Sequence, residues 1–428
     1  MPQEPAVWIG LLDLESDGDV AAVSGEPGPG HREARVLVRM HHAPLGHVHV
    51  PVSPRETLTA RARAAAESAM AGQLREHAGC QPGPPAPGPS SDWKKSVSCP
   101  SGFPARGPEI SVVVCTRNRP EQLRGCLTAL RRVTYEPLEV LVVDNAPSDD
   151  RTRDLVTELA REDPRFRYTS EPRPGLSRAR NHGLATAKFD LVAFTDDDIR
   201  VDQGWPAALA AGFSSDPEAV CVTGVVVPSA LNTGAERYFD SRYAWGEAFE
   251  AQRYDLGEHR APARLYPFTA GIFGTGANFA VRRQAVADLG GFDCLLGAGG
   301  PGRGGEDLDM FLRLVMAGGR ICYVPSALVW HQHRSDTATL AEQIYSYGYG
   351  LGAYLAKHLL NRDFSVAFLM RGFTGKAIDT STRMQSAAKS SQLNGLARQL
   401  AVREAAGVAA GALRYYRASR KPPEVQPS

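Results

Sequence analysis

Between residues 110 and 195 the sequence alternates short apolar runs with amphipathic segments, and no other feature constrains the fold as strongly. The apolar runs are typical of buried strands, while the segments between them place leucines on one face of a helix. Repeated strand and helix units form a parallel sheet covered by helices on both faces, so the predicted fold class is α/β. The expected strands are 110–115, 138–143, 166–169 and 191–195, separated by helices that open at Pro120, Thr152 and Leu176.

The composition indicates a folded chain of two or three domains. Of the 428 residues, 43% are hydrophobic and 22% are charged, values typical of globular proteins. The net charge of +1 provides no global excess of positive charge to attract nucleic acid, so no nucleic-acid partner is expected. The seven cysteines include no CxxC pair, and we interpret them as reduced thiols.

The sequence shows no targeting or membrane-spanning segment. The first residues lack a basic region, and Asp13 interrupts the apolar run 7–14. Nowhere do 18 uncharged apolar residues follow one another. We therefore expect a cytoplasmic protein, with peripheral attachment at the inner face of the cell membrane left open.

Changes in composition divide the chain into four expected regions. The segment 80–108 contains eight prolines among glycines and serines, which favours an extended linker. Before it, 34–40 and 47–52 are expected to be strands joined by a turn at Pro44–Gly46. The regions are a small α/β module of unknown function at 1–79, the linker at 80–108, the main α/β domain at 109–335 and a helical carboxy-terminal region at 336–428.

Acidic residues follow two of the expected strands. Asp196 and Asp198 come directly after the strand 191–195, where alternate side chains point the same way, so their carboxylates can meet on one divalent cation. An acidic turn or a helix cap is the plainer interpretation of such a pair in isolation. Asp144 and Asn145 end another strand, and open α/β sheets bind ligands at this edge.

A glycine-rich loop precedes a second acidic pair. Residues 297–305 contain six glycines and lead into Glu306 and Asp307, which begin an apolar-faced helix. A carboxylate beside such a loop can act as a general base, although the helix dipole alone also favours acids at this position. His331 follows an expected strand, where it is either a metal ligand or a structural side chain.

In this order the motifs resemble the family-2 glycosyltransferases of the GT-A fold. The resemblance covers about residues 109–335 and rests on the segments 110–120, 142–145, 176–181, 194–198, 290–293 and 305–309, together with His331. It implies a Rossmann-like mixed sheet with helices on both faces. It also implies a metal-dependent inverting transferase that uses a nucleotide sugar. The expected donor is a UDP-, GDP- or dTDP-sugar.

The resemblance also assigns roles to individual residues. Asp307 would be the general base, with Glu306 as its competitor for this role. Asp196 and Asp198 would hold Mg2+ or Mn2+ against the donor diphosphate, with His331 near the metal. The nucleotide and donor would be bound by Asn118, Asp144, Asn145, Arg180, Asn181 and Asp197.

Processive members of the family carry a QxxRW motif and several membrane helices, and this sequence has neither. Transfer of one sugar to a discrete acceptor is therefore expected, and that acceptor is a glycan, a lipid-linked molecule or a small molecule. Two alternatives stay open. A sugar nucleotidyltransferase would need a glycine-rich loop after its first strand, where residues 115–119 contain no glycine. A degenerate transferase would serve only as a binding module.

Two segments near the carboxy terminus have helical spacing. Residues 340–360 are rich in tyrosine and are interpreted as a packing helix or an interfacial membrane helix, with Gly348, Gly350 and Gly352 weakening its helix propensity. Residues 402–420 form a basic amphipathic stretch, and contact of this tail with anionic lipid is a hypothesis.

Overall fold

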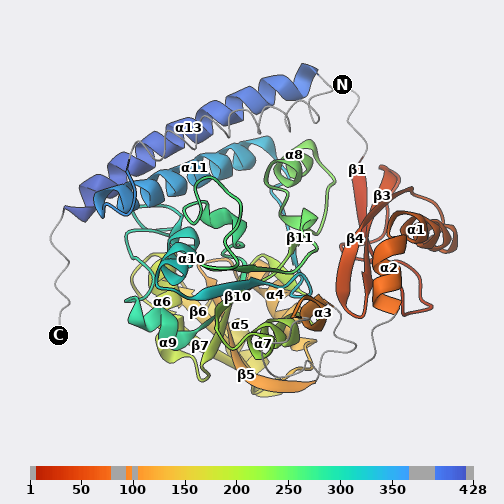
Figure 1. Cartoon of the computed structure of the whole chain (residues 1–428), viewed down its shortest axis with the longest axis horizontal. Helices are drawn as coiled ribbons and strands as arrows, with labels where there is room; N and C mark the ends of the chain where they lie inside the picture. Colours follow the sequence, from red (N-terminus) through yellow and green to blue (C-terminus); the bar gives the residue numbers. More distant parts are fainter. Residues whose placement is uncertain (1–5, 79–92, 99–104, 366–390, 421–428) are drawn as a thin grey trace.

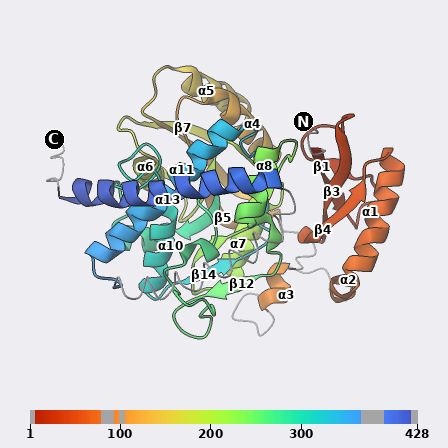
Figure 2. The ribbon, with the colours of Figure 1, turned by 90° about the horizontal axis from the view of Figure 1, so that it is seen from above.

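The computed structural model describes residues 6–78, 93–98, 105–365 and 391–420, and it shows three parts (Figure 1). A small sheet with two helices contains the amino-terminal strands, and a larger α/β body contains the central sheet. Two long helices lie across the body. Seen from above, the last helix crosses the body while the small sheet stands to one side (Figure 2). Most of the expected linker, including Cys80 and Cys99, lies outside the described residues.

The central sheet has eight strands and is mixed. In spatial order they are β12 (Gln252–Tyr254), β14 (Arg320–Tyr323), β10 (Ala219–Thr223), β13 (Asn278–Arg282), β8 (Leu191–Asp196), β5 (Arg106–Thr116), β6 (Glu136–Asn145) and β7 (Phe166–Glu171). The strands β8, β5, β6 and β7 are parallel, while β13 is antiparallel to both of its neighbours. All four expected strands are present, and the α/β fold class is confirmed.

Helices cover both faces of this sheet because successive strand residues point to opposite sides. Val112 and Val114 of β5 belong to the same core cluster as Leu127, whereas Val113 belongs to the other main cluster, with Leu184. The first layer contains α4 (Pro120–Arg131), α5 (Arg151–Glu162) and α7 (Trp205–Ser215), and the second contains α6 (Leu176–Thr186), α9 (Arg283–Asp288) and α10 (Glu306–Met316).

A three-stranded sheet lies beside the central one and brings His331 close to the turn at Asp196–Asp198, called the acidic turn below. Its strands are, in order, β11 (Val226–Pro228), β15 (Val329–His331) and β9 (Ile199–Val201). His331 pairs with Ile199, the residue that follows Asp198. After β11 the chain forms α8 (Gly234–Tyr243), which begins with a capping box between Thr233 and Glu236, and the short helices η1 (Trp245–Glu247) and η2 (Ala270–Ile272).

The amino-terminal module, residues 6–78, is a four-stranded sheet with two helices. The strands are, in order, β2 (Ala21–Ala22), β1 (Ala6–Asp13), β3 (His31–Met40) and β4 (Ala43–Pro51), and the helices are α1 (Arg55–Ala69) and α2 (Ala71–Ala78). The expected turn at Pro44–Gly46 is wrong. The strands β3 and β4 are joined at His41 and His42, which both have positive φ angles, as a two-residue hairpin turn of matching twist requires.

Part of the expected linker is folded. The helix α3 (Trp93–Ser98) buries Trp93 and Val97 in the core of the central body, and the Arg253 guanidinium lies 4.4 Å from the centre of a Trp93 ring. The expected linker 80–108 is therefore helical at α3 rather than extended, and this helix packs on the core of the central body. Two apolar side chains in a proline-rich context were too weak a signal to predict a docked helix.

The long helices α11 (Thr337–Leu360) and α13 (Ser391–Ser419) run parallel and touch through glycines. A Cβ built at Gly348 would lie 2.2 Å from the backbone oxygen of Glu404, and one at Gly352 would lie 2.0 Å from that of Val408. Gly411 meets the backbone of Tyr349 in the same way. The glycines that weaken helix propensity therefore allow two backbones to approach closely, and α11 is a packing helix.

Among the described residues, no helix has both the length and the apolar character needed to cross a bilayer.

Candidate active site

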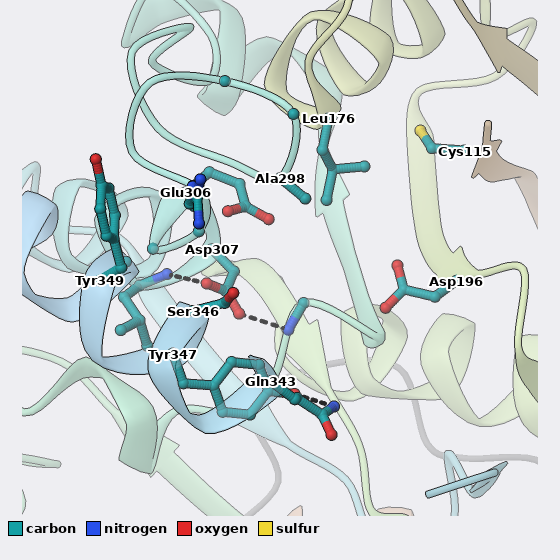
Figure 3. Close-up of a pocket in the computed structure, with 18 of the residues that line it drawn as sticks. Cys115, Leu176, Asp196, Ala298, Glu306, Asp307, Gln343, Ser346, Tyr347 and Tyr349 are labelled. Atoms are coloured by element: carbon teal, nitrogen blue, oxygen red, sulfur yellow. Dashed lines mark hydrogen bonds between the residues drawn. The ribbon is translucent and has the colours of Figure 1, made fainter. Parts of the chain in front are cut away.

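A large cavity of about 2140 Å³ lies at the carboxyl ends of β5 and β8. From the sheet it is lined by the residues that follow these strands, and from the other side by the glycine-rich loop, the start of α10, and residues of α11 and α13. Figure 3 shows Asp196 on one side of this cavity and Asp307 on the other. Of the predicted site residues the cavity brings together eight, namely Asn145, Arg180, Asp196, Asp197, Asp198, Glu306, Asp307 and His331.

The three consecutive aspartates after β8 have different surroundings. The side chain of Asp196 is 38% exposed, and its Oδ1 lies 3.7 Å from the Arg180 guanidinium. Asp197 is buried and accepts hydrogen bonds from Thr116 Oγ1 at 2.8 Å and from Arg119 at 2.6 Å. Asp198 accepts a hydrogen bond from the same arginine at 3.1 Å. Asp197 thus anchors the turn, and its contact with the donor stays a prediction.

The pKa values of these acids show how much negative charge is crowded at the turn. Removal from bulk water raises the pKa of Asp196 to about 7 and that of Asp197 to about 6, and the neighbouring carboxylates add to the rise. Burial also opposes ionisation of Asp198, but His331 and Arg119 lower its pKa below the ordinary value. A bound cation would favour the ionised forms of Asp196 and Asp197.

The buried guanidinium of Arg180 links the two acidic segments. It donates to Glu306 Oε1 at 2.7 Å and to the backbone oxygen of Gly276 at 2.9 Å. Phe194, Phe279 and Phe292 surround it within 6 Å. Burial raises the pKa of Glu306, while its pairing with Arg180 opposes that rise. The carboxylate of Glu306 is therefore used in the ion pair that holds Arg180 in place.

Asp307 is the more available acid of this pair. Its Oδ2 accepts a hydrogen bond from the backbone nitrogen of Gly276 at 2.8 Å, and its Oδ1 accepts one from that of Leu308, also at 2.8 Å. Both contacts come from neutral donors, and no ion pair between Asp307 and another described residue is present. Two backbone donors orient the carboxylate toward the cavity, which it lines (Figure 3).

His331 is buried beside Asp198. Its Nε2 lies 3.9 Å from Asp198 Oδ1, which is too long for a hydrogen bond. Its Nδ1 lies 3.0 Å from Nδ1 of His333, a residue whose role the sequence did not suggest. Burial lowers the pKa of His331 to about 4, so its ring is neutral at pH 7.

The fit of a divalent cation can be judged from these contacts. Two bonds of about 2.1 Å to one ion span at most about 4.2 Å, so the 3.9 Å between His331 and Asp198 is compatible with a shared ion. In the described ranges, no group of three or more His, Cys, Asp or Glu side chains could hold a metal by itself. The residues therefore fit an ion whose other ligands are phosphate oxygens or water, as is usual for Mg2+.

Two of the predicted donor-binding residues lie apart from the cavity, and their side chains hold loops together. The amide of Asn181 donates to the backbone oxygen of Phe292 at 2.9 Å and accepts from its nitrogen at 2.7 Å. The side-chain oxygen of Asn118 accepts two hydrogen bonds from Ser148, both at 3.0 Å. Neither residue is part of the cavity lining. The amide of Asn181 and the side-chain oxygen of Asn118 are thus used within the protein, and binding of the nucleotide by these two residues stays a prediction.

The predicted donor-binding residues Asn145 and Asp144, at the end of β6, have different surroundings. Asn145 lines the cavity, and its amide holds the following loop by donating to Arg173 and accepting from Gly175, both at 2.8 Å. Asp144 is buried beneath it and accepts a hydrogen bond from the Tyr168 hydroxyl at 3.2 Å. Its Oδ1 is buried and has no hydrogen-bond partner among the described residues, and Asp144 is not part of the cavity lining. Burial raises the pKa of Asp144.

Several cavity residues were missed by sequence reasoning. An aromatic wall is formed by Tyr243, Trp245 and Tyr347, and Gln343 donates to the Tyr347 hydroxyl at 3.2 Å. These side chains come from η1 and the ends or faces of two helices far apart in the sequence. No local motif predicts these residues. An aromatic cluster on a helix with polar neighbours is only a weak signal of a cavity wall.

The sequence of the central body matches a known family. Residues 111–290 match the family model described as glycosyl transferase family 2. Over this region the chain matches a family-2 glycosyltransferase domain. The match begins within β5 and includes the acidic turn after β8, so the recognised region contains the sheet side of the cavity.

Individual relatives of this chain cover a similar region. A pre-mycofactocin glycosyltransferase from Mycobacterium tuberculosis is 30% identical over 258 residues, which are 60% of this chain and 50% of that protein. A glucosyl-dolichyl phosphate glucuronosyltransferase from Haloferax volcanii is 28% identical over 251 residues, 56% of this chain and 75% of that protein. The chain thus spans about half the length of the first of these relatives.

Among solved structures, a mannosyltransferase from Pyrobaculum calidifontis in complex with GDP-Man and Mn2+ has a TM-score of 0.47 and 18% sequence identity to this chain. The alignment covers 84% of this chain and 97% of that one.

Proposed function

We propose that the chain is a metal-dependent, inverting glycosyltransferase that moves one sugar from a nucleotide-sugar donor to an acceptor hydroxyl. The observation that carries the proposal is that Asp196, Asp198 and Asp307 line one cavity of a family-2 domain. Acids that crowd at the end of β8 suit a cation and diphosphate, and the oriented acid of α10 suits a base. Asp196 and Asp307, which would serve these two functions, lie on facing sides of the cavity (Figure 3).

On the donor side, Asp196 and Asp198 would hold Mg2+ or Mn2+, with His331 as a further ligand. The ion would neutralise the charge that develops on the departing nucleoside diphosphate. The free Oδ1 of Asp144 would accept a hydrogen bond from the nucleoside, and Arg180 would keep Asp196 in place from behind. The donor class is a UDP-, GDP- or dTDP-sugar.

On the acceptor side, Asp307 would take the proton of the acceptor hydroxyl as its oxygen bonds to the anomeric carbon. The bond between that carbon and the diphosphate oxygen breaks in the same step, so the configuration inverts. Glu306 is a poorer base because Arg180 holds its carboxylate at 2.7 Å. The absence of a QxxRW motif in the sequence supports transfer of a single sugar.

The acceptor is a glycan, a lipid-linked molecule or a small molecule, since the two relatives named above differ in the acceptors for which they are named. Peripheral contact with the inner face of the cell membrane would involve α13, which exposes Val402 and Leu413. Cosedimentation with phosphatidylglycerol vesicles tests this contact. Binding that is unchanged in a Val402→Ser/Leu413→Ser variant would contradict it.

The central test is thermal unfolding with UDP, GDP and dTDP, each with and without Mn2+. One nucleotide is expected to raise Tm only when Mn2+ is present, and Asp198→Asn should abolish the rise without changing the Tm of the ligand-free protein. A full shift in Asp198→Asn would contradict the metal site. The matching nucleotide sugar is then supplied with acceptors, and NMR of the product anomer tests inversion.

A further inference from the structure

The amino-terminal module reaches the cavity wall through one buried arginine. Arg35 on β3 is 5% exposed. Its two terminal nitrogens contact Asp240 Oδ2 on α8 at 2.6 Å and Glu247 Oε1 in η1 at 2.5 Å. Both partners belong to the segment that carries Tyr243 and Trp245 into the cavity. A charge buried this deeply is costly unless it is paired, so the contact with Asp240 fixes the module against α8.

From Asp240 a line of polar side chains continues to the acidic turn. Asp240 Oδ1 lies 3.9 Å from His333 Nε2, and His333 Nδ1 lies 3.0 Å from His331 Nδ1. His331 Nε2 in turn faces Asp198 Oδ1 at 3.9 Å. Burial opposes ionisation of Asp240, but the contacts with His333 and Arg35 lower its pKa, so it is a carboxylate at neutral pH.

The 3.0 Å contact between the two Nδ1 atoms requires one ring to donate and the other to accept. A proton on His333 Nε2, the nitrogen that faces the Asp240 carboxylate, leaves its Nδ1 as the acceptor. His331 must then donate from its own Nδ1, and the lone pair of its Nε2 points toward Asp198. A histidine that binds a metal needs such a free nitrogen, and outer partners of this kind orient the ring.

Apolar packing supports the same contact. Ile9 and Leu37 of the module share a buried cluster with Val227 of β11 and Trp330 of β15. Trp330 directly precedes His331, and the backbone of Val7 pairs with that of Leu231. The module therefore braces the strand that ends at His331, as well as the helix that carries Asp240.

We propose that the amino-terminal module is part of the active-site scaffold, with Arg35 as a positioning residue that holds Asp240, His333 and His331 in line with Asp198. The inference rests on the proposed metal site and assigns a role to a region for which the sequence suggested none. Arg35 does not line the cavity, so its effect on the reaction passes through His331.

The test compares Arg35→Met with Arg39→Met in the full chain. Arg39 is a matched control because it lies on the same strand and also crosses to the main body, where it pairs with Asp202 at 2.9 Å, away from the cavity lining. Mn2+ binding is followed by electron paramagnetic resonance with UDP, GDP or dTDP present. Loss of an outer partner costs about 10- to 100-fold in metal affinity, and we expect such a loss in Arg35→Met alone.

Two further variants keep the test decisive. Asp240→Asn preserves volume and should weaken Mn2+ binding as Arg35→Met does, and Arg35→Lys should restore part of the affinity. Equal Mn2+ affinity in folded Arg35→Met and the parent chain would overturn the inference and leave the proposed function intact. Parallel losses in Arg35→Met and Arg39→Met would also overturn it, because the role would then be general stability. A parent chain that binds no Mn2+ with any nucleotide would refute the proposed function as well.

Discussion

The two sides of the cavity are built in different ways. On the sheet side, Asp196 and Asp198 stand at the end of a buried parallel strand, where the local pattern already places them. On the helical side, Tyr347, Gln343 and Arg414 come from long helices whose positions depend on contacts between distant segments. Polar residues at the end of a strand can therefore be predicted from a sequence motif. The residues of the opposite wall cannot, because they depend on how the helices pack. The predictions below test this contrast.

The largest expected effect is on turnover, and it should distinguish variants of the two acids at the start of α10. Asp307→Asn should reduce kcat by about 10²- to 10⁴-fold with little change in Tm, because it removes the base and keeps the shape. Glu306→Gln should instead lower Tm, because it leaves the buried Arg180 without its charged partner. Steady-state kinetics and thermal unfolding of both variants check this. A Glu306→Gln variant that loses turnover at unchanged Tm, beside an active Asp307→Asn, would reverse the assignment.

The next effect concerns the ion pairs that tie the helical side to α10. Asp309 is fully buried, and the Lys357 ammonium lies 2.7 Å from it and 3.0 Å from Asp293. Burial alone would raise the pKa of Asp309, but the contacts of Asp309 with its neighbours lower it to about 2. Lys357→Met should destabilise the chain by about 3 kcal/mol, because the buried Asp309 and the partly buried Asp293 both lose a partner.

Denaturant unfolding measures this change. The exposed pair of Arg131 and Glu162 provides the control, since Arg131→Met should cost less than about 1 kcal/mol. Similar losses in the two variants would show that the buried network does not couple α11 to α10.

A smaller effect is expected where α11 and α13 touch. Gly352→Ala should cost about 1–3 kcal/mol, because its Cβ would lie 2.0 Å from the backbone oxygen of Val408. Gly395→Ala has open space around it and should stabilise α13 by up to about 1 kcal/mol. Thermal unfolding of the two variants compares the sites. Stabilisation by both substitutions would mean that the helices do not approach as closely as the structure shows.

The smallest effect is a pH dependence on the sheet side. Since the pKa of Asp196 is raised to about 7, its contribution to stability is present at acidic pH and is lost as the pH rises through 7. The ligand-free protein should therefore lose Tm between pH 5 and 8. Mn2+ with the preferred nucleotide should raise Tm more at pH 8, where the carboxylate is ionised.

The control for this pH dependence is Asp196→Asn, which should flatten the profile of the ligand-free protein. An equal rise in Tm on adding Mn2+ and nucleotide at pH 5.5 and pH 8 would argue against Asp196 as a ligand.

The sequence by itself determined the α/β body and the edge where the acids gather. Apolar runs of strand length between amphipathic helices leave few other folds, and the acids that follow β8 occupy its carboxyl end in any parallel arrangement. For the same local reason Asp307 begins α10 beside a glycine-rich loop. The metal and catalytic roles of these acids remain proposals.

Only the tertiary structure decided which polar side chains face the cavity. Asn181 belongs to a motif that the family resemblance links to the donor, yet its amide is fully used on Phe292, over one hundred residues away. Gly352 weakens a helix when it is considered alone, but it permits a backbone contact with Val408. Arg35 acquires a partner only when a separate module docks on α8. Each of these roles depends on a neighbour distant in sequence, and linear spacing carries no information about such contacts.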